Sequence, residues 1–196
     1  MARRGAYAKG VAKREEILSA ALEVIARDGY GRASIRQLAE AVGLSQAGLL
    51  HYFSSKEELF AEVLRKRDEQ DRQRYEDRGV GVSMFEGFRR TIARNADVPG
   101  LVQLYTHLSA EATDPEHPAH AFFRERTETL CALVAGEIRG GQADGSVRPE
   151  LDPDRTALLL MSAADGLQTQ WLMDPTIDMA EHIGLLLQLI AVRDET

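Results

Sequence analysis

Apolar residues recur along most of this 196-residue chain with the spacing of α-helices, and they almost nowhere show the strict alternation of β-strands. Between residues 35 and 42, Ile35, Leu38, Ala39 and Val42 stand at i, i+3, i+4 and i+7, on one face of a helix. We therefore predict an all-α protein of about nine helices. The expected helices cover roughly residues 10–28, 34–42, 45–53, 55–78, 84–95, 99–112, 117–140, 153–173 and 178–193.

Glycine and proline mark the expected loops between these helices. Residues 79–83 (GVGVS) are the expected hinge, and residues 140–153 (GGQADGSVRPELDP) are an expected loop, because glycine, proline and short polar residues favour turns. Asp152 before Pro153 is typical of a helix start. The helix over residues 55–78 is expected to begin with a capping box, with Ser55 as the cap and Glu58 as its partner. It is polar on most faces, which favours a connecting role between two parts of the molecule.

The ends of the second expected helix carry their own signals. Ser34 can cap its start, and Gln37 completes the spacing of a capping box. Gly43 follows directly, where a chain that turns sharply out of a helix favours a residue without a Cβ atom. Ser45 can cap the next helix. Two short helices joined by such a turn are the layout of a helix-turn-helix DNA-binding motif.

Packing between the two short helices fits this layout. Leu49, Tyr52 and Phe53 of the second helix would pack back on the first. Ala39 lies where two steeply crossing helices leave room only for a methyl group. The same residues also fit an ordinary helix pair in an all-α core, which is the alternative interpretation.

Basic residues concentrate at the amino end. Residues 1–56 hold nine Lys and Arg against five Asp and Glu, a net charge of +4, whereas the rest of the chain carries −11 and the whole chain −7. A basic end on an acidic body favours binding of a polyanion through that end. Arg3, Arg4 and Lys9 form a basic arm, which we expect to be disordered without DNA; insertion into the minor groove is the alternative.

The motif lies within a longer stretch that resembles a known family. Residues 41–60 (AVGLSQAGLLHYFSSKEELF) resemble the signature of the TetR/AcrR family of bacterial transcription regulators, and residues 13–40 continue the match, so that it covers about a quarter of the chain. The resemblance implies a helix-turn-helix DNA-binding domain over residues 1–55 and a helical effector-binding and dimerisation domain over residues 56–196. The short segment 164–175 (ADGLQTQWLMDP) is similar to the carboxyl domain of betaine-aldehyde-type repressors within that family.

The expected contacts with DNA bases come from the start of the second short helix, which lies in the major groove in such motifs. Its first residues are Ser45, Gln46, Ala47 and Gly48. The Gln46 amide can pair with adenine, and the Ala47 methyl can touch the methyl group of thymine. Gly48 permits a close approach of backbone to DNA.

The resemblance also implies contacts with the phosphate backbone. In the family, the positions of His51, Tyr52 and Lys56 commonly touch phosphates, and Ser34 and Arg36 at the start of the preceding helix fit the same role. A histidine in a core is more often a structural residue, so a packing role for His51 is the alternative. We favour the phosphate contact, because the neighbouring Leu50 and Phe53 can supply the packing.

One such motif contacts too few base pairs to select a site, so we expect a homodimer on a near-palindromic double-stranded operator. The last two expected helices, with the segments 157–173 (ALLLMSAADGLQTQWLM) and 183–192 (IGLLLQLIAV), are apolar around much of their circumference. We expect them to form the dimer surface, as the corresponding pair does in the family.

An unknown small-molecule effector is expected to bind in the body of the protein and to release the dimer, as a repressor, from its operator. An activator is the alternative. A mostly apolar cavity with a few polar groups is typical of small-molecule sites. For each candidate the alternative is plain core packing, and Asp165 fits the dimer surface equally well. The candidate effector-binding residues are Phe88, Tyr105, His107, Leu108, Phe123, Met161, Asp165, Gln168 and Trp171.

Other classes of protein fit the sequence less well. It contains no phosphate-binding glycine loop and no nucleophile elbow, and we expect neither enzymatic activity nor a cofactor or metal. Glu116, His117 and His120 are near one another but fit a solvated loop better than a metal site. Cys131, in an apolar helical segment, is expected to be a buried, inert thiol.

The location of the protein follows from similar arguments. No segment approaches the roughly 20 apolar residues of a membrane span, and the basic amino end lacks the apolar core of a secretory signal. We expect a cytoplasmic, nucleoid-associated bacterial protein. The remaining alternative is an all-helical scaffold protein with negligible affinity for DNA even at low salt.

Overall fold

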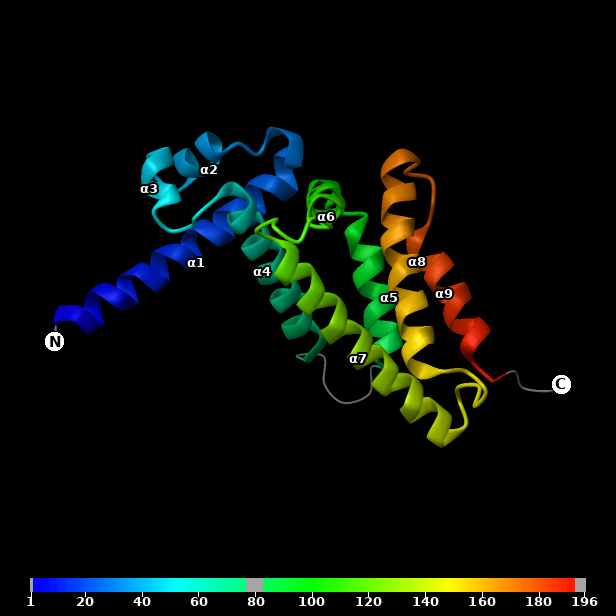
Figure 1. The fold of residues 1–196 in the computed structure, drawn as a ribbon. Coiled ribbons are helices and arrows are strands. Elements are labelled where there is room, and N and C mark those ends of the chain that lie inside the picture. The colour runs from blue at the N-terminus through cyan, green and yellow to red at the C-terminus, as the bar shows by residue number, and fades with distance from the viewer. Residues whose placement is uncertain (1, 77–82, 193–196) are drawn as a thin grey trace. The chain divides into compact units, whose positions relative to one another are not determined.

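The computed structural model describes residues 2–76 and 83–192, with side chains for residues 9–74 and 83–192. Within these residues the chain forms nine α-helices and one 3-10 turn, and the β-type pairing there is a single bridge between Val147 and Ala191 (Figure 1). The all-α prediction is therefore confirmed. The predicted hinge at residues 79–83 lies, except for its last residue, outside the described residues.

The helices pack as two compact units. The reader unit comprises residues 1–74 and 98–122, and the body unit comprises residues 75–97 and 123–196. The predicted boundary between two functional domains at residue 55 remains a prediction. The packing units have different limits, because residues 98–122, which include the sixth helix, pack with residues 1–74. The elements in chain order are α1 (Ala2–Asp28), η1 (Tyr30–Arg32), α2 (Ile35–Ala41), α3 (Gln46–Leu50), α4 (Lys56–Glu76), α5 (Met84–Asn95), α6 (Pro99–Glu111), α7 (His120–Asp144), α8 (Pro153–Met173) and α9 (Met179–Ile190).

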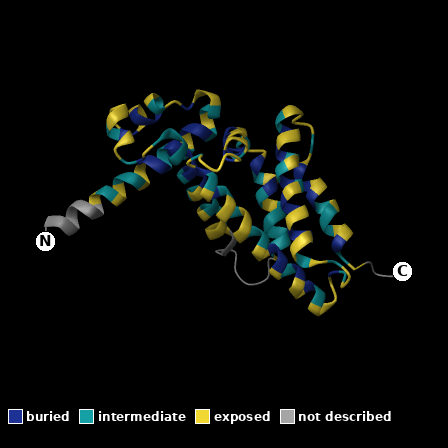
Figure 2. Ribbon diagram, in the orientation of Figure 1, coloured by how far each residue is buried: buried dark blue, intermediate teal, exposed yellow. Residues whose placement is uncertain are grey.

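The core of the reader unit forms where the apolar faces of its helices meet (Figure 2). Ile17 and Ile25 of α1 are fully buried, and Leu22 is half-buried. Ala39 is also buried, which fits its predicted place at a close helix crossing. The large, fully buried side chains of this unit are Ile17, Ile25, Leu38, Leu49, Phe53, Leu59, Phe60, Val63, Leu104 and Leu108.

Helix α6 approaches α1 very closely at Gly100. A Cβ atom on Gly100 would lie 2.1 Å from the carbonyl oxygen of Ile25 and 2.8 Å from Cα of Gly29. Only glycine allows two backbones to come this near, so Gly100 sets the separation of the two helices. Pro99 in the first turn of α6 is compatible with the helix start, where a backbone N–H has no helical acceptor.

The body unit packs α5, α7, α8 and α9 around an apolar cluster. Asp152 caps α8 by accepting a hydrogen bond from the Arg155 N–H at 2.9 Å, with Pro153 in the first turn as predicted. Asp178 caps α9 in the same way through the Glu181 N–H. The buried members of the cluster are Val134, Ala135, Ile138, Val147, Ala157, Leu160, Met161 and Ile190.

Several helix ends differ from the prediction, among them ends of α1, α7 and α9. The backbone of α1 is helical from Ala2 rather than from residue 10, which fits the alanine, arginine and lysine residues of this segment, because all three favour helices. The expected disordered arm is therefore wrong for its backbone, and the side chains of Arg3 and Arg4 lie outside the described ones. Helix α9 ends at Ile190, where the chain turns to extended backbone and Val192 N–H donates to the Ser146 carbonyl oxygen at 2.9 Å.

The predicted loop over residues 140–153 begins later than expected, because α7 continues to Asp144. Gly141 is helical and packs against the returning chain: a Cβ atom there would lie 2.5 Å from Cγ2 of Val147. Its carbonyl oxygen accepts a hydrogen bond from the Val147 N–H at 2.9 Å. This glycine therefore serves close packing and does not end the helix.

Candidate DNA-binding site

The turn between α2 and α3 has the geometry that its sequence predicts. Gly43 adopts φ of 66°, a left-handed conformation that favours glycine. The Leu44 N–H donates to the Ala39 carbonyl oxygen at 2.9 Å, and the Gly43 N–H donates to that of Glu40 at 3.2 Å. This pair of bonds is a Schellman motif, which satisfies the last carbonyl groups of α2 and turns the chain toward α3.

Helix α3 starts immediately after the turn and exposes its first residues. The Ser45 hydroxyl accepts a hydrogen bond from the Gly48 N–H at 3.0 Å, which caps the helix. Gln46 and Ala47 are exposed, whereas Leu49 is fully buried. A Cβ atom on Gly48 would lie 3.2 Å from the Ser45 hydroxyl oxygen, so glycine also relieves crowding at the cap. The polar start of α3 therefore faces outward while its apolar side anchors it.

The residues that follow α3 divide between surface and core. Phe53 is buried, with 2% of its surface exposed, whereas His51 is exposed and Tyr52 is half-buried. The ring centroids of His51 and Tyr52 are 5.8 Å apart. His51 therefore does not occupy a core position, which removes the packing alternative. Leu50, in contrast, is 41% exposed, so the packing role that its apolar character predicts is wrong.

The start of α2 also matches the prediction. Ser34 and Gln37 form the capping box: the Gln37 N–H donates to the Ser34 hydroxyl at 3.2 Å, and the Ser34 N–H donates to the Gln37 side-chain oxygen at 3.1 Å. Arg36 is exposed, and its Nε lies 3.7 Å from a carboxylate oxygen of Glu40. An exposed ion pair at this distance contributes little, so the guanidinium is readily available to a phosphate.

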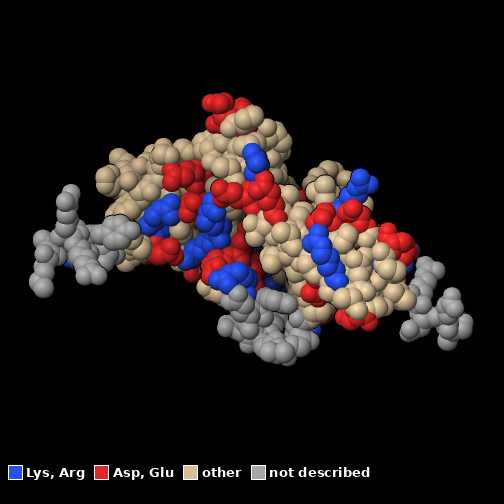
Figure 3. Space-filling model, turned by 60° about the horizontal axis from the view of Figure 1, so that its bottom comes forward, with Lys and Arg blue, Asp and Glu red and all other residues tan. Residues whose placement is uncertain are grey.

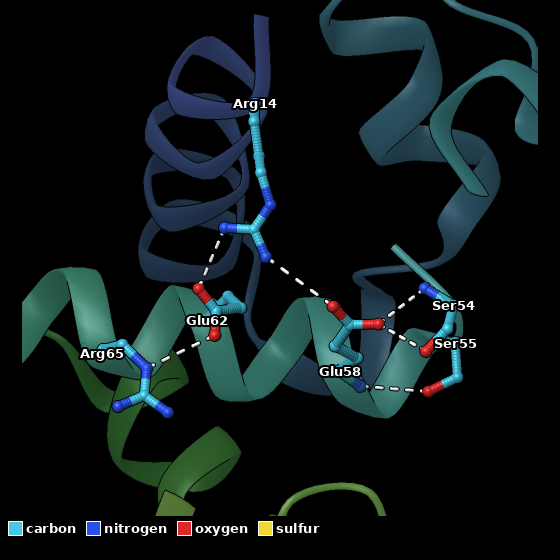
Figure 4. Close-up of polar contacts among 6 residues, drawn as sticks. All are labelled: Arg14, Ser54, Ser55, Glu58, Glu62 and Arg65. Carbon is cyan, nitrogen blue, oxygen red and sulfur yellow. Dashed lines mark hydrogen bonds and ion pairs between the residues drawn. The ribbon is translucent and has the colours of Figure 1, made fainter. Parts of the chain in front are cut away.

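Helix α4 starts at Lys56, where a cation opposes the helix dipole. The Ser55 hydroxyl accepts a hydrogen bond from the Glu58 N–H at 3.0 Å, as the predicted cap requires. The Glu58 carboxylate accepts from the Ser54 N–H at 2.6 Å and from the Ser54 hydroxyl rather than from Ser55 (Figure 4). These contacts and the nearby Arg14 guanidinium lower the pKa of the Glu58 carboxyl below its usual value.

Arg14 of α1 connects this turn to the body of α4. Its Nη1 donates to Glu62 at 3.0 Å, and its Nη2 lies 3.7 Å from Glu58, as Figure 4 shows. The guanidinium also lies over the Phe53 ring, 4.7 Å from the ring centroid. Arg14 thus joins α1 to α4 and to Phe53, which lies in the segment between α3 and α4.

Two neighbours of Arg14 complete this bracing. The Lys13 ammonium donates to the carbonyl oxygen of Val42, at the end of α2, at 3.0 Å, and to Glu16 at 2.7 Å. Glu15 pairs with Lys66 of α4 at 2.6 Å. Two basic residues of the amino end, Lys13 and Arg14, therefore contact the motif and α4, a role that the charge count did not reveal. On the face shown in Figure 3, basic and acidic side chains are interspersed accordingly.

The candidate effector-binding residues fall in both units. In the reader unit, Tyr105 and Leu108 are buried, and the exposed His107 lies against the Tyr30 ring, with centroids 5.4 Å apart. The body unit holds the other six: Phe88, Phe123, Met161, Asp165, Gln168 and Trp171.

Within the body unit, the polar candidates cluster around a buried hydrogen bond. The Asn95 amide donates to the Gln168 side-chain oxygen at 3.1 Å, and both residues are buried. The Gln168 amide in turn lies 3.4 Å from a carboxylate oxygen of the half-buried Asp165. Met161 belongs to the apolar cluster, and Phe88 packs against it. A role of any of the six in ligand binding remains a prediction.

Other chemistry suggested by the sequence finds little support in the described residues. The His117 ring accepts from the Ala119 N–H, and a ring nitrogen of His120 lies 2.8 Å from the Ala112 carbonyl oxygen. In that part of the chain, no three His, Cys, Asp or Glu residues come together as metal ligands would. Cys131 is half-buried, and burial together with Asp165 raises the pKa of its thiol. Across residues 2–76 and 83–192, no helix has the length and hydropathy that crossing a membrane requires.

The geometry of α2, the turn at Gly43 and α3 is that of helix-turn-helix DNA-binding proteins. Comparisons with known proteins indicate the family within this class. Residues 17–63 match the family model of bacterial regulatory proteins, tetR family. The HTH-type transcriptional repressor KstR2 of Rhodococcus jostii (strain RHA1) is 26% identical, covering 78% of this chain and 76% of that protein. The chain carries the DNA-binding domain of the TetR family of transcriptional regulators, whose members are DNA-binding proteins rather than enzymes.

Two solved structures resemble the whole fold. A protein from Rhodococcus sp., described as a TetR-family transcriptional regulator, superposes with a TM-score of 0.72 at 24% identity, covering 91% of this chain and 98% of that one. A protein from Saccharomonospora viridis, described as a transcriptional regulator and solved in complex with choline, has a TM-score of 0.71 at 25% identity, covering 92% and 98% of the two chains.

Proposed function

We propose that this protein is a homodimeric repressor that binds a near-palindromic operator and is released when a small molecule binds to it. The observation that carries the proposal is the arrangement of α3: its polar first turn is exposed, while Leu49 and Phe53 anchor it to a braced core. A short helix held in this way, after a tight glycine turn, can enter the major groove of duplex DNA.

Base recognition is assigned to Gln46 and Ala47, with Ser45 and Gly48 shaping the helix start. Phosphate contacts are assigned to Ser34, Arg36, His51, Tyr52 and Lys56. Among these, Lys56 is the strongest candidate, because it is the first residue of the 21-residue helix α4. The helix dipole and the cation there attract the same anionic group.

The two kinds of contact are separable by experiment. An operator duplex is first selected by the protein from a random pool, and affinities for it and for a random duplex are then measured over a range of salt concentrations. Gln46→Ala should weaken operator binding about tenfold or more and leave random DNA unaffected. Lys56→Gln should weaken both and lower the salt slope by about 1. Gln73→Ala, an exposed change on α4, serves as the control.

Each outcome bears on the assignment. If Gln46→Ala weakens operator and random DNA equally, or weakens neither, Gln46 does not read bases. If the parent protein selects no sequence and binds no duplex at low salt, the proposed function is wrong. That result would favour the alternative of an all-helical scaffold protein.

The dimer surface is assigned to the outer faces of α8 and α9. On α8, Leu159 and Met173 are 70% and 72% exposed, and on α9, Leu185 and Leu189 are 54% and 46% exposed. Between the two α8 residues, Ser162 and Gly166 are exposed and small, which permits a close approach of a second helix. Apolar stripes of this kind are typical of a surface that a partner covers, and a near-palindromic operator requires that partner to be a second copy.

The effector is proposed to bind in the body unit, near Gln168 and Trp171. A similar fold that was solved with choline supports a small-molecule site in this kind of protein. An effector that binds more tightly to the dimer state with low DNA affinity shifts the population toward that state and releases the operator.

Trp171 provides the readout for this part of the proposal, since it is the single tryptophan of the chain and is largely buried. The protein is titrated with choline and with the substrates and products of enzymes that neighbouring genes encode. A compound that is the effector should change the Trp171 fluorescence and, over the same concentration range, weaken operator binding. A compound that releases DNA without changing this fluorescence would place the effector site elsewhere.

A further inference from the structure

A stack of aromatic rings in the reader unit lies against the Lys56 side chain. Tyr30, in the 3-10 turn after α1, meets the buried Phe60 of α4 edge-on, with ring centroids 5.5 Å apart. His107 of α6 lies on Tyr30 as well, with centroids 5.4 Å apart and ring planes tilted by 32°. The stack therefore joins three segments that are distant in the sequence.

The Lys56 ammonium lies over this stack. Its Nζ is 5.1 Å from the centroid of the Phe60 ring and 5.8 Å from that of Tyr30. Both distances are within the range in which a ring face attracts a cation. Among the described residues no carboxylate pairs with Lys56, in contrast to Lys13 and Lys66, which pair with Glu16 and Glu15. The ring faces therefore hold this ammonium without neutralising its charge.

The charge state and the position of the Tyr30 ring are both well defined in this arrangement. Burial, together with the charges of Glu111 and Glu57, raises the pKa of its phenol above the usual value, so the ring stays neutral. Gly29, which precedes it, has φ of 84°, a conformation that turns the chain sharply after α1. The position of Tyr30 is thus set by this backbone turn and by the 3-10 turn that Tyr30 begins.

We propose that Tyr30, packed on Phe60 and flanked by His107, is a positioning residue that holds the Lys56 ammonium ready to contact the DNA backbone. A long, flexible lysine loses rotamer freedom when it binds a phosphate, and a side chain already ordered by the rings loses less. The inference rests on the proposed function, because it assigns a role to Tyr30 and His107 through the phosphate contact of Lys56.

The test compares Tyr30 variants in the presence and in the absence of the lysine charge. Tyr30→Leu and Tyr30→Phe are made in the full-length protein and in the Lys56→Gln variant, and affinities for the selected operator and for a random duplex are measured. Tyr30→Leu should weaken binding to both duplexes about fivefold, the size of one exposed cation–π contact, whereas Tyr30→Phe keeps the ring and should retain the parent affinity. In the Lys56→Gln variant, Tyr30→Leu should have no further effect.

A purely structural role of Tyr30 predicts a different pattern. If Tyr30→Leu weakens binding by the same factor with and without Lys56, or if Tyr30→Phe behaves like Tyr30→Leu, the positioning role is wrong. Should Tyr30→Leu fail to fold, His107→Ala, a change at an exposed residue, is compared in the same two backgrounds and should show a smaller loss, about twofold, only when Lys56 is present. If the parent binds its operator and Lys56→Gln binds equally well, this inference fails while the proposed function stands.

Discussion

The two units of this protein expose different kinds of surface. Among the described side chains of the reader unit, the exposed large apolar ones are Val11 and Leu50, whereas the described part of the body unit exposes seven: Leu133, Leu158, Leu159, Met173, Leu185, Leu189 and Val192. Nucleic acid offers charged and polar groups, and a protein partner offers apolar ones. The contrast fits the proposed function, which assigns DNA binding to the reader unit and the dimer surface to the body unit.

The units also differ in what holds their helices together. The reader unit contains most of the large, fully buried side chains of the molecule, and polar contacts such as Arg14–Glu62 join helices 48 residues apart. The body unit is built around an apolar cluster, and its ion pairs include Glu86–Arg89 within α5 and Arg139–Asp154 between α7 and α8. A short recognition helix requires a rigid support, because a small displacement changes which base edges it can reach.

The largest expected effect comes from disrupting the proposed dimer surface on α8 and α9. Leu159→Glu combined with Leu185→Glu places charges on both exposed stripes of α8 and α9 and should convert the dimer to monomers, measured by sedimentation. Operator affinity should then fall about a hundredfold or more, because one half-site binds weakly by itself. Leu133→Glu, at a leucine of α7 that is 53% exposed, is the matched control and should leave both properties unchanged. A double variant that stays dimeric would remove α8 and α9 from the interface.

The next effect compares a tightly packed glycine with an open one. Gly100→Ala would place its Cβ atom 2.1 Å from the Ile25 carbonyl oxygen and should lower the free energy of unfolding by about 3 kcal/mol. Gly136→Ala, within α7 and with no other atom within 4 Å of the new Cβ, should raise it by about 0.5–1 kcal/mol. Urea denaturation measures both. Equal effects of the two changes would mean that α1 and α6 do not approach each other this closely.

A smaller effect compares a bracing ion pair with a local one. Arg14→Gln removes the contacts with Glu58, Glu62 and Phe53, and should lower the free energy of unfolding by about 1–2 kcal/mol, since the group is partly exposed. Arg124→Gln removes an exposed i,i+4 pair with Glu128 and should change it by less than about 0.5 kcal/mol. Similar losses for both variants would contradict the special role of Arg14.

The smallest effect is a pH dependence in the body unit. Hydrogen bonds from Arg89 and Arg90 lower the pKa of the Glu86 carboxyl from 4.5 to about 2. Because the unfolded chain takes up this proton first, the stabilisation is present above the unfolded pKa of 4.5 and is lost as the pH falls toward about 2. Glu86→Gln should therefore lower the melting temperature at neutral pH, with a difference from the parent that narrows below about pH 4. A constant difference at all pH values would mean that the charge of Glu86 contributes nothing.

Local sequence signals predicted most of the helix-turn-helix motif. The capping box of Ser34 and Gln37, the left-handed Gly43 and the cap at Ser45 each depend on residues within four positions, and all three are confirmed. The roles of individual residues in DNA or effector binding remain predictions. Leu50 and Gly141 show the limit of such signals, because apolar character and glycine content do not tell which surface or which neighbouring chain a residue meets.

By itself, the sequence determined the all-α class, the main helices and the turn before α3, since backbone hydrogen bonds and caps in helices are local. Only the tertiary structure decided that Lys13 and Arg14 brace the motif, that Gly100 sets the approach of α6 to α1, and that Tyr30 reaches Lys56. These contacts join residues 26 to 75 positions apart. Their partners are set by how helices pack, which depends on the shape of whole faces rather than on any short pattern.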